Sequence, residues 1–457
     1  MGRALDRTDK IFDRVLQDIK PSKEEAADIT YKVNDLMGVL AGIVPRAVEL
    51  RVAGSIARGT NLKGTADIDI FMLFDRKVSR DAIVARGIKY GKAVLEKRKG
   101  RYEIKYAEHP YIRLYLDSFG MKADIVPAFK IDNAEDMGTA VDRTPLHTEF
   151  INSHLSARQR DEVRVLKYLL KAHGIYGAEV KTEGFSGYLC ELLIYHYGSL
   201  SRLLSFAAGF RLPLIISEGG TGKVDIARML GKFNNSRFIV IDPVDPDRNV
   251  AAGVSIESLG RLVLVARRFI EKPDIKLFYG YGFSDAQARK LSQSLRNEAG
   301  LDTFLMVAGV PDKSEDVIYP QLRKMNAQIV KSLQESGFAV YMNTQLVKGR
   351  KGMLFIAAPS QRLGSRMLKG PDIFIPGASQ NFIGKHKGAL GFCIIGSSLY
   401  AIEKARIHSV KEALDNLPPR LLVHKDIDLR KAKLFVNKVP GSYAIPIYSE
   451  LMKKLLI

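Results

Sequence analysis

The chain has 457 residues, of which 46% are hydrophobic and 26% are charged. A chain of this length is expected to form about three domains with several buried cores, and its composition excludes wholesale disorder and a fibrous architecture. Seventy Lys and Arg against fifty Asp and Glu give a formal net charge of +20, which favours a polyanionic partner such as nucleic acid.

A helix of about twenty residues is predicted near the start of the chain. Ser22 and Glu25 form a capping box, and apolar residues recur at helical spacing after it. Short strands are predicted at residues 48–52, 68–74, 102–106, 111–116 and 123–127. This mixture predicts an α+β first domain over residues 1–150.

The spacing of the apolar residues changes after residue 150. Helical spacing from residue 157 predicts a mainly helical second domain over residues 151–275, with helices from 157 to the glycine at 174, at 187–204 and at 259–270. The remaining residues, 276–457, are expected to form one or two α+β modules. Their helices are predicted at 287–297 and 320–336, and their strands at 303–307, 353–357 and 391–395.

Compartment is predicted from the cysteines and from the absence of membrane signals. Cys190 and Cys393 lack metal-ligand or redox spacing, which favours a reducing compartment. The most apolar stretch, residues 187–210, carries Glu191 and Arg202, which argues against a membrane helix. The N-terminal segment has charges of both signs and no apolar core, unlike a secretion signal. We therefore expect a cytoplasmic protein.

The most informative stretch is residues 54–74, GSIARGTNLKGTADIDIFMLF, where a Gly-Ser turn precedes two aspartates on a predicted strand. Because strand side chains alternate, Asp67 and Asp69 should point to one face while their neighbours enter the core. Two close carboxylates repel each other unless a divalent cation binds them, and Mg²⁺ suits such oxygen ligands. Asp124, on another predicted strand, is the candidate third ligand of a two-metal site.

The turn before the aspartates is the candidate phosphate site. Gly54 lets the backbone approach a polyanion, Ser55 offers a hydroxyl and an amide, and Arg58 follows one turn later. A Gly-Ser pair alone is usually an ordinary turn. In combination with Asp-x-Asp on an apolar strand, it favours a site for nucleotide phosphates.

This combination resembles the signature of the nucleotidyltransferase superfamily of DNA polymerase β type. Further segments narrow the resemblance, in this order: YAEHPYIRLYL, AVDRTPLH, LKYLLKAHGIYGAE, GFSGYLCELLI and DPVDPDRNVAAGVS. Together they resemble the archaeal (class I) CCA-adding tRNA nucleotidyltransferases over about residues 20–270. The resemblance implies a palm with a mixed or antiparallel sheet, a helical central nucleotide-binding domain, and a C-terminal α+β body and tail that bind tRNA.

The resemblance also implies roles for particular residues. It implies that Asp67, Asp69 and Asp124 bind two Mg²⁺ ions and are catalytic, and that the triphosphate is bound by Ser55, Arg58, Lys167, Tyr176 and Ser186. It places Thr144 and His147 near the incoming nucleotide or the primer end, with His109 nearby. It implies that Arg248 and Asn249 read the base edge. ATP and CTP are the implied substrates.

Several of these residues also have ordinary interpretations. Lys167 lies among leucines, where a lysine usually keeps only its charged end in water. His147 fits a cap, a surface residue or a satisfied core histidine equally well, and Tyr188 is expected to be a core aromatic. The run KGRKG at residues 348–352 is predicted to be a solvated hairpin tip.

The implied reaction is attack by the tRNA 3′-hydroxyl on the α-phosphorus of CTP or ATP, without a template. Recognition of tRNA, at its acceptor and elbow region, is expected to rely on shape and backbone. A poly(A) polymerase, or a nucleotidyltransferase with another acceptor, would share the Gly-Ser turn and the aspartates. A non-catalytic RNA-binding module is the alternative from another class, and a homodimer is left open.

Overall fold

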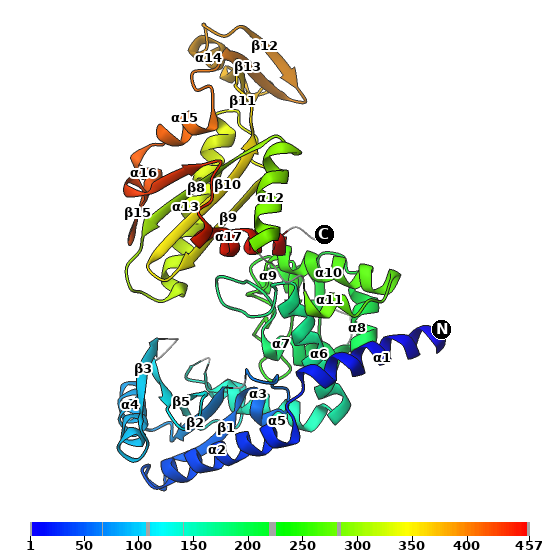
Figure 1. Cartoon of the computed structure of the whole chain (residues 1–457), viewed down its shortest axis with the longest axis vertical. Helices are drawn as coiled ribbons and strands as arrows, with labels where there is room; N and C mark the ends of the chain where they lie inside the picture. The colour runs from blue at the N-terminus through cyan, green and yellow to red at the C-terminus, as the bar shows by residue number, and fades with distance from the viewer. Residues whose placement is uncertain are drawn as a thin grey trace. The chain divides into compact units, whose positions relative to one another are not determined.

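The computed structural model describes residues 2–65, 67–106, 110–139, 141–218, 225–280 and 285–454. The chain forms two compact units, one ending at residue 281 and the other beginning at residue 282 (Figure 1). Both units mix helices with strands, so the predicted α+β class is confirmed. The division into three domains at residues 150 and 275 stays a prediction.

A five-stranded sheet with the order β1-β2-β5-β4-β3 forms the centre of the first half of unit 1 (Figure 1). Its strands are β1 Glu49–Ala53, β2 Ile68–Phe74, β3 Gly100–Tyr106, β4 Pro110–Leu116 and β5 Lys122–Phe129. Strands β2 and β5 run parallel and the other neighbours run antiparallel. The sheet is therefore mixed, which is one of the two arrangements that the family resemblance implied.

One face of this sheet is covered by helices α2 (Lys23–Ala41) and α4 (Arg80–Lys97), which share its apolar core. Ser22 caps α2 as predicted, because its hydroxyl accepts a hydrogen bond from the Glu25 amide at 3.1 Å. The Glu25 carboxylate accepts from the Gly64 amide at 2.7 Å. In β2, Ile68 and Ile70 are fully buried against these helices. Asp69 lies between them in the chain and so points to the opposite face of the sheet.

The helical half of unit 1 packs around one apolar core. Its helices are α5 Arg143–His154, α6 Ala157–Ala172, α7 Gly187–Tyr197, α8 Leu200–Ala207, α9 Ile226–Lys232, α10 Ile256–Glu271 and α11 Lys276–Tyr279, joined by short strands β6 Leu214–Ile216 and β7 Phe238–Val240. The prediction of one helix over residues 187–204 was wrong. Gly198, with φ of +79°, ends α7, and the Ser199 side chain begins α8.

Several helices of unit 1 were not predicted, among them the two long helices α4 and α1 (Gly2–Ile19). In α1, Phe12, Val15 and Ile19 are buried in the helical core, with charged residues at the positions between them. Charges on the exposed side of an amphipathic helix do not oppose helix formation. The sequence analysis considered only the charges of this segment and not the spacing of its apolar residues, so it did not predict the helix.

Unit 2 contains a four-stranded sheet, β16-β8-β10-β9, and a three-stranded sheet, β11-β13-β12. The strands are β8 Leu301–Gly309, β9 Met342–Lys348, β10 Lys351–Pro359, β11 Ser365–Asp372, β12 Gly391–Ile395, β13 Ser398–Lys404 and β16 Lys433–Val436; the pair β14 Val423–His424 and β15 Ile427–Asp428 is separate. The helices are α12 Asp285–Asn297, α13 Glu315–Glu335, α14 Ala378–Lys385, α15 Val410–Asp415, α16 Pro419–Leu422 and α17 Gly441–Lys454.

The predicted hairpin of unit 2 is confirmed, because Lys348 of β9 pairs with Lys351 of β10 around an exposed turn. Helix α13 begins five residues before the predicted start at Pro320, since the acidic Glu315 and Asp316 occupy its first turn. None of the helices in the described ranges has both the length and the apolar character needed to cross a membrane.

Candidate active site

The three predicted catalytic aspartates come together at the end of strands β2 and β5. The parallel register of these strands aligns Asp69 directly with Asp124. Asp67 comes immediately before β2, and strand alternation places it on the same face as Asp69. Sequence spacing predicted the first pair, and the strand pairing brings in the third residue.

The pKa shifts of the aspartates show that their carboxylates interact electrostatically. Burial raises the pKa of Asp69 to about 7, and the charges of Asp124 and Asp67 act in the same direction against the opposing effect of two arginines. Burial also raises the pKa of Asp67, although Lys122 opposes it. Oxygen ligands in such mutual repulsion fit a divalent cation, which would relieve that repulsion.

Asp124 is held by a residue that the sequence analysis missed. Arg113 of β4 lies opposite Asp124 and donates from Nε and Nη2 to its two carboxylate oxygens, both at 2.6 Å. Within the described parts of the chain, no three acidic, histidine or cysteine side chains form a ready-made metal site. Each Asp124 oxygen accepts one hydrogen bond from Arg113 and keeps a second lone pair that could bind a metal ion.

The Gly-Ser turn is packed directly against Asp69. Helix α3 (Gly54–Ala57) begins at Gly54, where φ is +70°, a conformation that residues with a side chain rarely adopt. A Cβ atom at this position would lie 1.8 Å from the Asp69 Oδ2 atom. Only glycine satisfies both conditions, and it allows the turn that carries Ser55 to pack against the Asp69 carboxylate.

Arg58 and Lys167, both predicted to grip phosphates, meet at one buried carboxylate. Glu191 of α7 is 0% exposed and lies 2.8 Å from Arg58 Nε and 3.4 Å from Lys167 Nζ. The Thr60 hydroxyl accepts from Lys167 at 2.9 Å and donates to Glu191 at 2.5 Å. The sequence analysis missed Glu191 as a site residue, although it lies inside the quoted segment GFSGYLCELLI.

Lys167, Tyr176 and the start of α7 form the neighbouring wall. Ser186 caps α7 by accepting a hydrogen bond from the Leu189 amide at 3.1 Å. A Cβ atom on Gly187 would lie 3.3 Å from the Tyr176 hydroxyl and 3.5 Å from Lys167 Nζ. Burial raises the pKa of Tyr176 above its usual value. The structure thus gathers these predicted phosphate residues, while their contact with phosphate stays a prediction.

A second buried carboxylate, Asp242, joins Arg248, one of the two predicted base readers, to His147 and Tyr188. Its oxygens lie 2.9 Å from His147 Nε2, 2.9 Å from the Tyr188 hydroxyl and 3.0 Å from Arg248 Nη1. The His147 and Tyr188 rings stack at 3.9 Å, and burial lowers the pKa of His147 although Asp242 opposes this shift. Tyr188 is buried, as expected of a core aromatic, but its hydroxyl also belongs to this polar network.

The remaining predicted residues differ in how they are placed. The Asn249 amide is engaged in holding the chain, since its oxygen accepts from the Val240 and Ala251 amides and its nitrogen donates to the Phe238 carbonyl at 3.0 Å. Reading a base would require Asn249 to give up part of this support. Thr144 lies half-buried on α5, and His109 falls outside the described residues.

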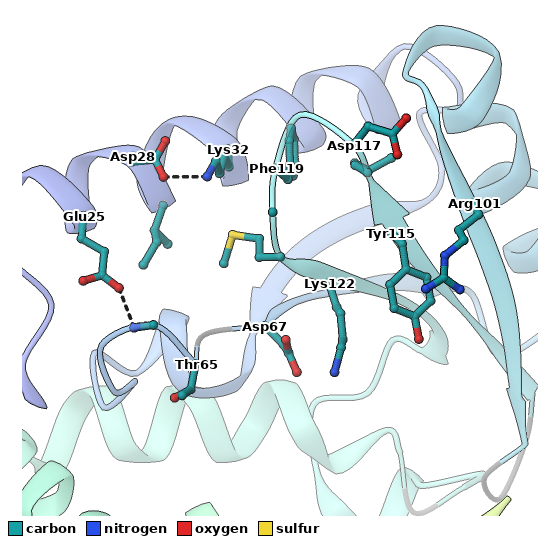
Figure 2. Close-up of a pocket in the computed structure, with 15 residues that line it drawn as sticks. Glu25, Asp28, Lys32, Thr65, Asp67, Arg101, Tyr115, Asp117, Phe119 and Lys122 are labelled. Carbon is teal, nitrogen blue, oxygen red and sulfur yellow. Dashed lines mark hydrogen bonds and ion pairs between the residues drawn. The ribbon is translucent and has the colours of Figure 1, made fainter. Parts of the chain in front are cut away.

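A cleft of about 700 Å³ opens beside Asp67 (Figure 2). Asp67 and Lys122 lie next to each other on one side, and helix α2 forms the opposite wall. At the far end, the Arg101 guanidinium lies 3.9 Å from the centre of the Tyr115 ring. The cleft therefore extends from Asp67 to strands β3 and β4.

A mixed sheet that carries Asp-x-Asp beside a third aspartate, with a Gly-Ser turn against them, defines a nucleotidyltransferase. Three family models match the chain: "Nucleotidyltransferase domain" at residues 21–147, "tRNA nucleotidyltransferase, second domain" at 161–279, and "CCA-adding enzyme, C-terminal domain" at 302–420. Together they span both units of the structure.

Curated relatives agree with these matches. The CCA-adding enzyme of Methanocaldococcus jannaschii is 38% identical over 83% of this chain and 84% of its own length. That of Methanothermobacter thermautotrophicus is 33% identical over 96% of this chain and 94% of its own length. The chain belongs to the archaeal CCA-adding tRNA nucleotidyltransferase family.

Proposed function

We propose that this protein builds or repairs the 3′-terminal CCA of tRNA without a template. It transfers CMP from CTP and AMP from ATP to the tRNA 3′-hydroxyl and releases pyrophosphate. The observation that carries the proposal is the register that sets Asp69 beside Asp124, directly against the Gly54 turn. The proposed location of this reaction is the cytoplasm.

The three aspartates act together as metal ligands in this proposal. Asp67, Asp69 and Asp124 would hold two Mg²⁺ ions, which would activate the attacking hydroxyl and neutralise charge on the leaving pyrophosphate. Arg113 fixes the orientation of the Asp124 carboxylate by donating to both of its oxygens. The carboxylates thus position charge, and the chain performs no covalent step of its own.

The nucleotide is proposed to lie between the Gly-Ser turn and the helical half of unit 1. The start of α7 and the Lys167 and Tyr176 pair would face its phosphates. Arg248, whose side chain is 33% exposed, is anchored through Nη1 on Asp242 and would present the rest of its guanidinium to the base. An arginine can donate to acceptors on both cytosine and adenine, which suits an enzyme that adds both.

Recognition of tRNA is proposed to depend on its shape and backbone. The net charge of +20 supplies a strong attraction to phosphates, and an enzyme that serves every tRNA can read little sequence. Unit 2 carries the match to the CCA-adding C-terminal domain and is the proposed tRNA-gripping body and tail. A homodimer stays a prediction.

The test is nucleotide addition to a tRNA transcript that lacks its CCA end. With CTP alone the product should stop after two C residues, with ATP alone no addition should occur, and with both nucleotides the product should end in CCA. Unlimited A addition without CTP would instead identify a poly(A)-type polymerase. A protein that binds this tRNA but incorporates no nucleotide would be the non-catalytic module.

Metal binding should depend on pH because of Asp69. Its pKa of about 7 lies above the ordinary 3.8, so a metal ion must displace a proton at pH 6 but not at pH 8. We expect Mg²⁺ affinity to be about tenfold weaker at pH 6 than at pH 8, from the ionised fraction of one such group. The readout is the Mg²⁺ concentration that gives half of the maximal rise in melting temperature.

The raised pKa of Asp69 also makes the stability of the folded protein depend on pH. The folded protein holds the Asp69 proton more tightly than the unfolded chain, so without metal this group lowers stability as the pH rises from 3.8 to about 7. Asp69→Asn should abolish this part of the pH dependence. Equal Mg²⁺ affinity at both pH values would show that Asp69 is not a titrating metal ligand.

A further inference from the structure

Glu191 is a buried carboxylate for which neither the reaction nor the family resemblance supplies a role. It is 0% exposed on α7, in the helical half of unit 1. One of its partners, Arg58, follows the Gly-Ser turn of the sheet half, and the other, Lys167, lies on α6. Charged groups are almost never buried this deeply unless they are paired, because removing them from water has a large desolvation cost. A functional role for Glu191 would explain why the protein accepts this cost.

We propose that Glu191 is a positioning residue for the nucleotide triphosphate, which holds Arg58 and Lys167 together as one clamp. The inference rests on the proposed function and deepens it, because it assigns the geometry of the phosphate grip to a residue outside the grip itself. The clamp consists of Arg58, Lys167, Glu191 and Thr60.

The charges of the clamp explain why a carboxylate is required. Lys167 is 1% exposed and Arg58 is 7% exposed, so water screens the repulsion between these cations poorly. A single carboxylate between them removes this repulsion and leaves one net positive charge. The two cations hold the pKa of Glu191 below its usual value despite its burial, so the carboxylate is ionised.

Thr60 fixes the clamp to the backbone that follows the Gly-Ser turn. Lys167 Nζ donates to the Thr60 hydroxyl at 2.9 Å and to the Thr60 carbonyl at 3.2 Å. The same hydroxyl donates to Glu191, and Thr60 is fully buried. The clamp therefore joins the sheet half of unit 1, through Arg58 and Thr60, to α6 and α7 of the helical half.

The clamp lies beside the residues that are proposed to bind the triphosphate. The positive charge of Arg58 opposes the rise in pKa that burial causes at Asp69 and at Tyr176, so Arg58 lies within electrostatic reach of both side chains. Lys167 lies beside the start of α7, since a Cβ atom on Gly187 would be 3.5 Å from its ammonium. A nucleotide therefore meets cations that are already desolvated and oriented, which reduces the reorganisation that binding requires.

Glu191→Gln tests the proposal, because it keeps the size of the side chain and removes its charge. In the absence of tRNA no transfer occurs, so dissociation constants can be measured directly by calorimetry in Mg²⁺. We expect CTP and ATP to bind about 10- to 100-fold more weakly, as for other broken buried charge pairs. Cytidine, which has no phosphates and is measured by competition, and CCA-less tRNA should bind within about twofold of wild type.

A matched control separates the clamp from ordinary structural support. Glu162 is also a buried glutamate of unit 1, paired with Arg158 at 3.3 Å and accepting from the Leu200 amide at 2.8 Å. Glu162→Gln should lower the melting temperature and leave the CTP dissociation constant within about twofold of wild type. In steady-state assays, Glu191→Gln should raise KM for both nucleotides far more than it lowers kcat.

Thr60→Val keeps the proposal testable if Glu191→Gln does not fold. The valine has a similar shape but lacks the hydroxyl that joins Lys167 to Glu191, so CTP binding should weaken in the same direction by a smaller factor. Wild-type CTP affinity in whichever of these variants folds, or equal weakening of CTP and cytidine, would overturn the proposal. A wild type that binds CTP through the clamp but adds no CCA would overturn the proposed function and leave the clamp standing.

Discussion

Asp69→Asn is expected to slow nucleotide addition by at least about a thousandfold, the equivalent of roughly 4 kcal/mol in the transition state. Asp69 is the central aspartate, since it lies beside Asp124 across the strands and two residues after Asp67. An amide keeps the shape of the side chain but loses the negative charge that a metal ion requires. The measurement is the single-turnover rate of CMP addition to CCA-less tRNA.

The stability of this variant should move in the opposite direction. The raised pKa of Asp69 shows that its charge is unfavourable in the folded protein, so its removal should leave the melting temperature at pH 8 unchanged or higher without metal. Asp75→Asn is the matched control, because Asp75 is an exposed aspartate just after the other end of β2. A variant Asp69→Asn with more than a tenth of wild-type activity would remove Asp69 from the catalytic group.

Arg248→Ala is expected to lower kcat/KM for both CTP and ATP by about a hundredfold, which corresponds to roughly 3 kcal/mol, and to relax discrimination against UTP. Arg248 is anchored by Asp242, and a third of its side chain remains exposed. Arg248→Lys should not rescue discrimination, because a lysine lacks the planar fork of donors. The measurement is kcat/KM for each nucleotide on a tRNA ending at the appropriate position.

The control for this prediction is Arg267→Ala. Arg267 lies on α10 of the same unit, and its Nε donates to the Ala208 carbonyl at 2.8 Å at an exposed site. Its loss should leave the CTP-to-UTP preference unchanged. An Arg248→Ala enzyme that still rejects UTP as wild type does would show that another group reads the base.

The sequence predicted those features that local patterns determine. The alternation in β2 identified the buried isoleucines and the face that carries Asp67 and Asp69, and the capping box located the start of α2. Breaks caused by a single backbone conformation were harder to predict. Gly198 interrupts an apolar run that satisfies helical spacing on both sides, and only its positive φ reveals the end of α7.

Partners that come from distant segments were not predictable from the pattern. Arg113 and Asp124 are eleven residues apart in the chain, and only the register of β4 and β5 places them opposite each other. Glu191 and Asp242 are single acidic residues within apolar or loop segments, and no spacing rule distinguishes them. Each gains its role by accepting cationic or polar groups from two or more elements, which requires the tertiary fold.

The left-handed turn at Gly54 constrains how a gene for this protein can diverge. Any side chain there would collide with the Asp69 carboxylate, in a backbone conformation that residues other than glycine rarely adopt. A replacement would therefore push Asp69 away from Asp124, its partner across the paired strands. We expect gene copies that keep the activity to keep glycine at this position.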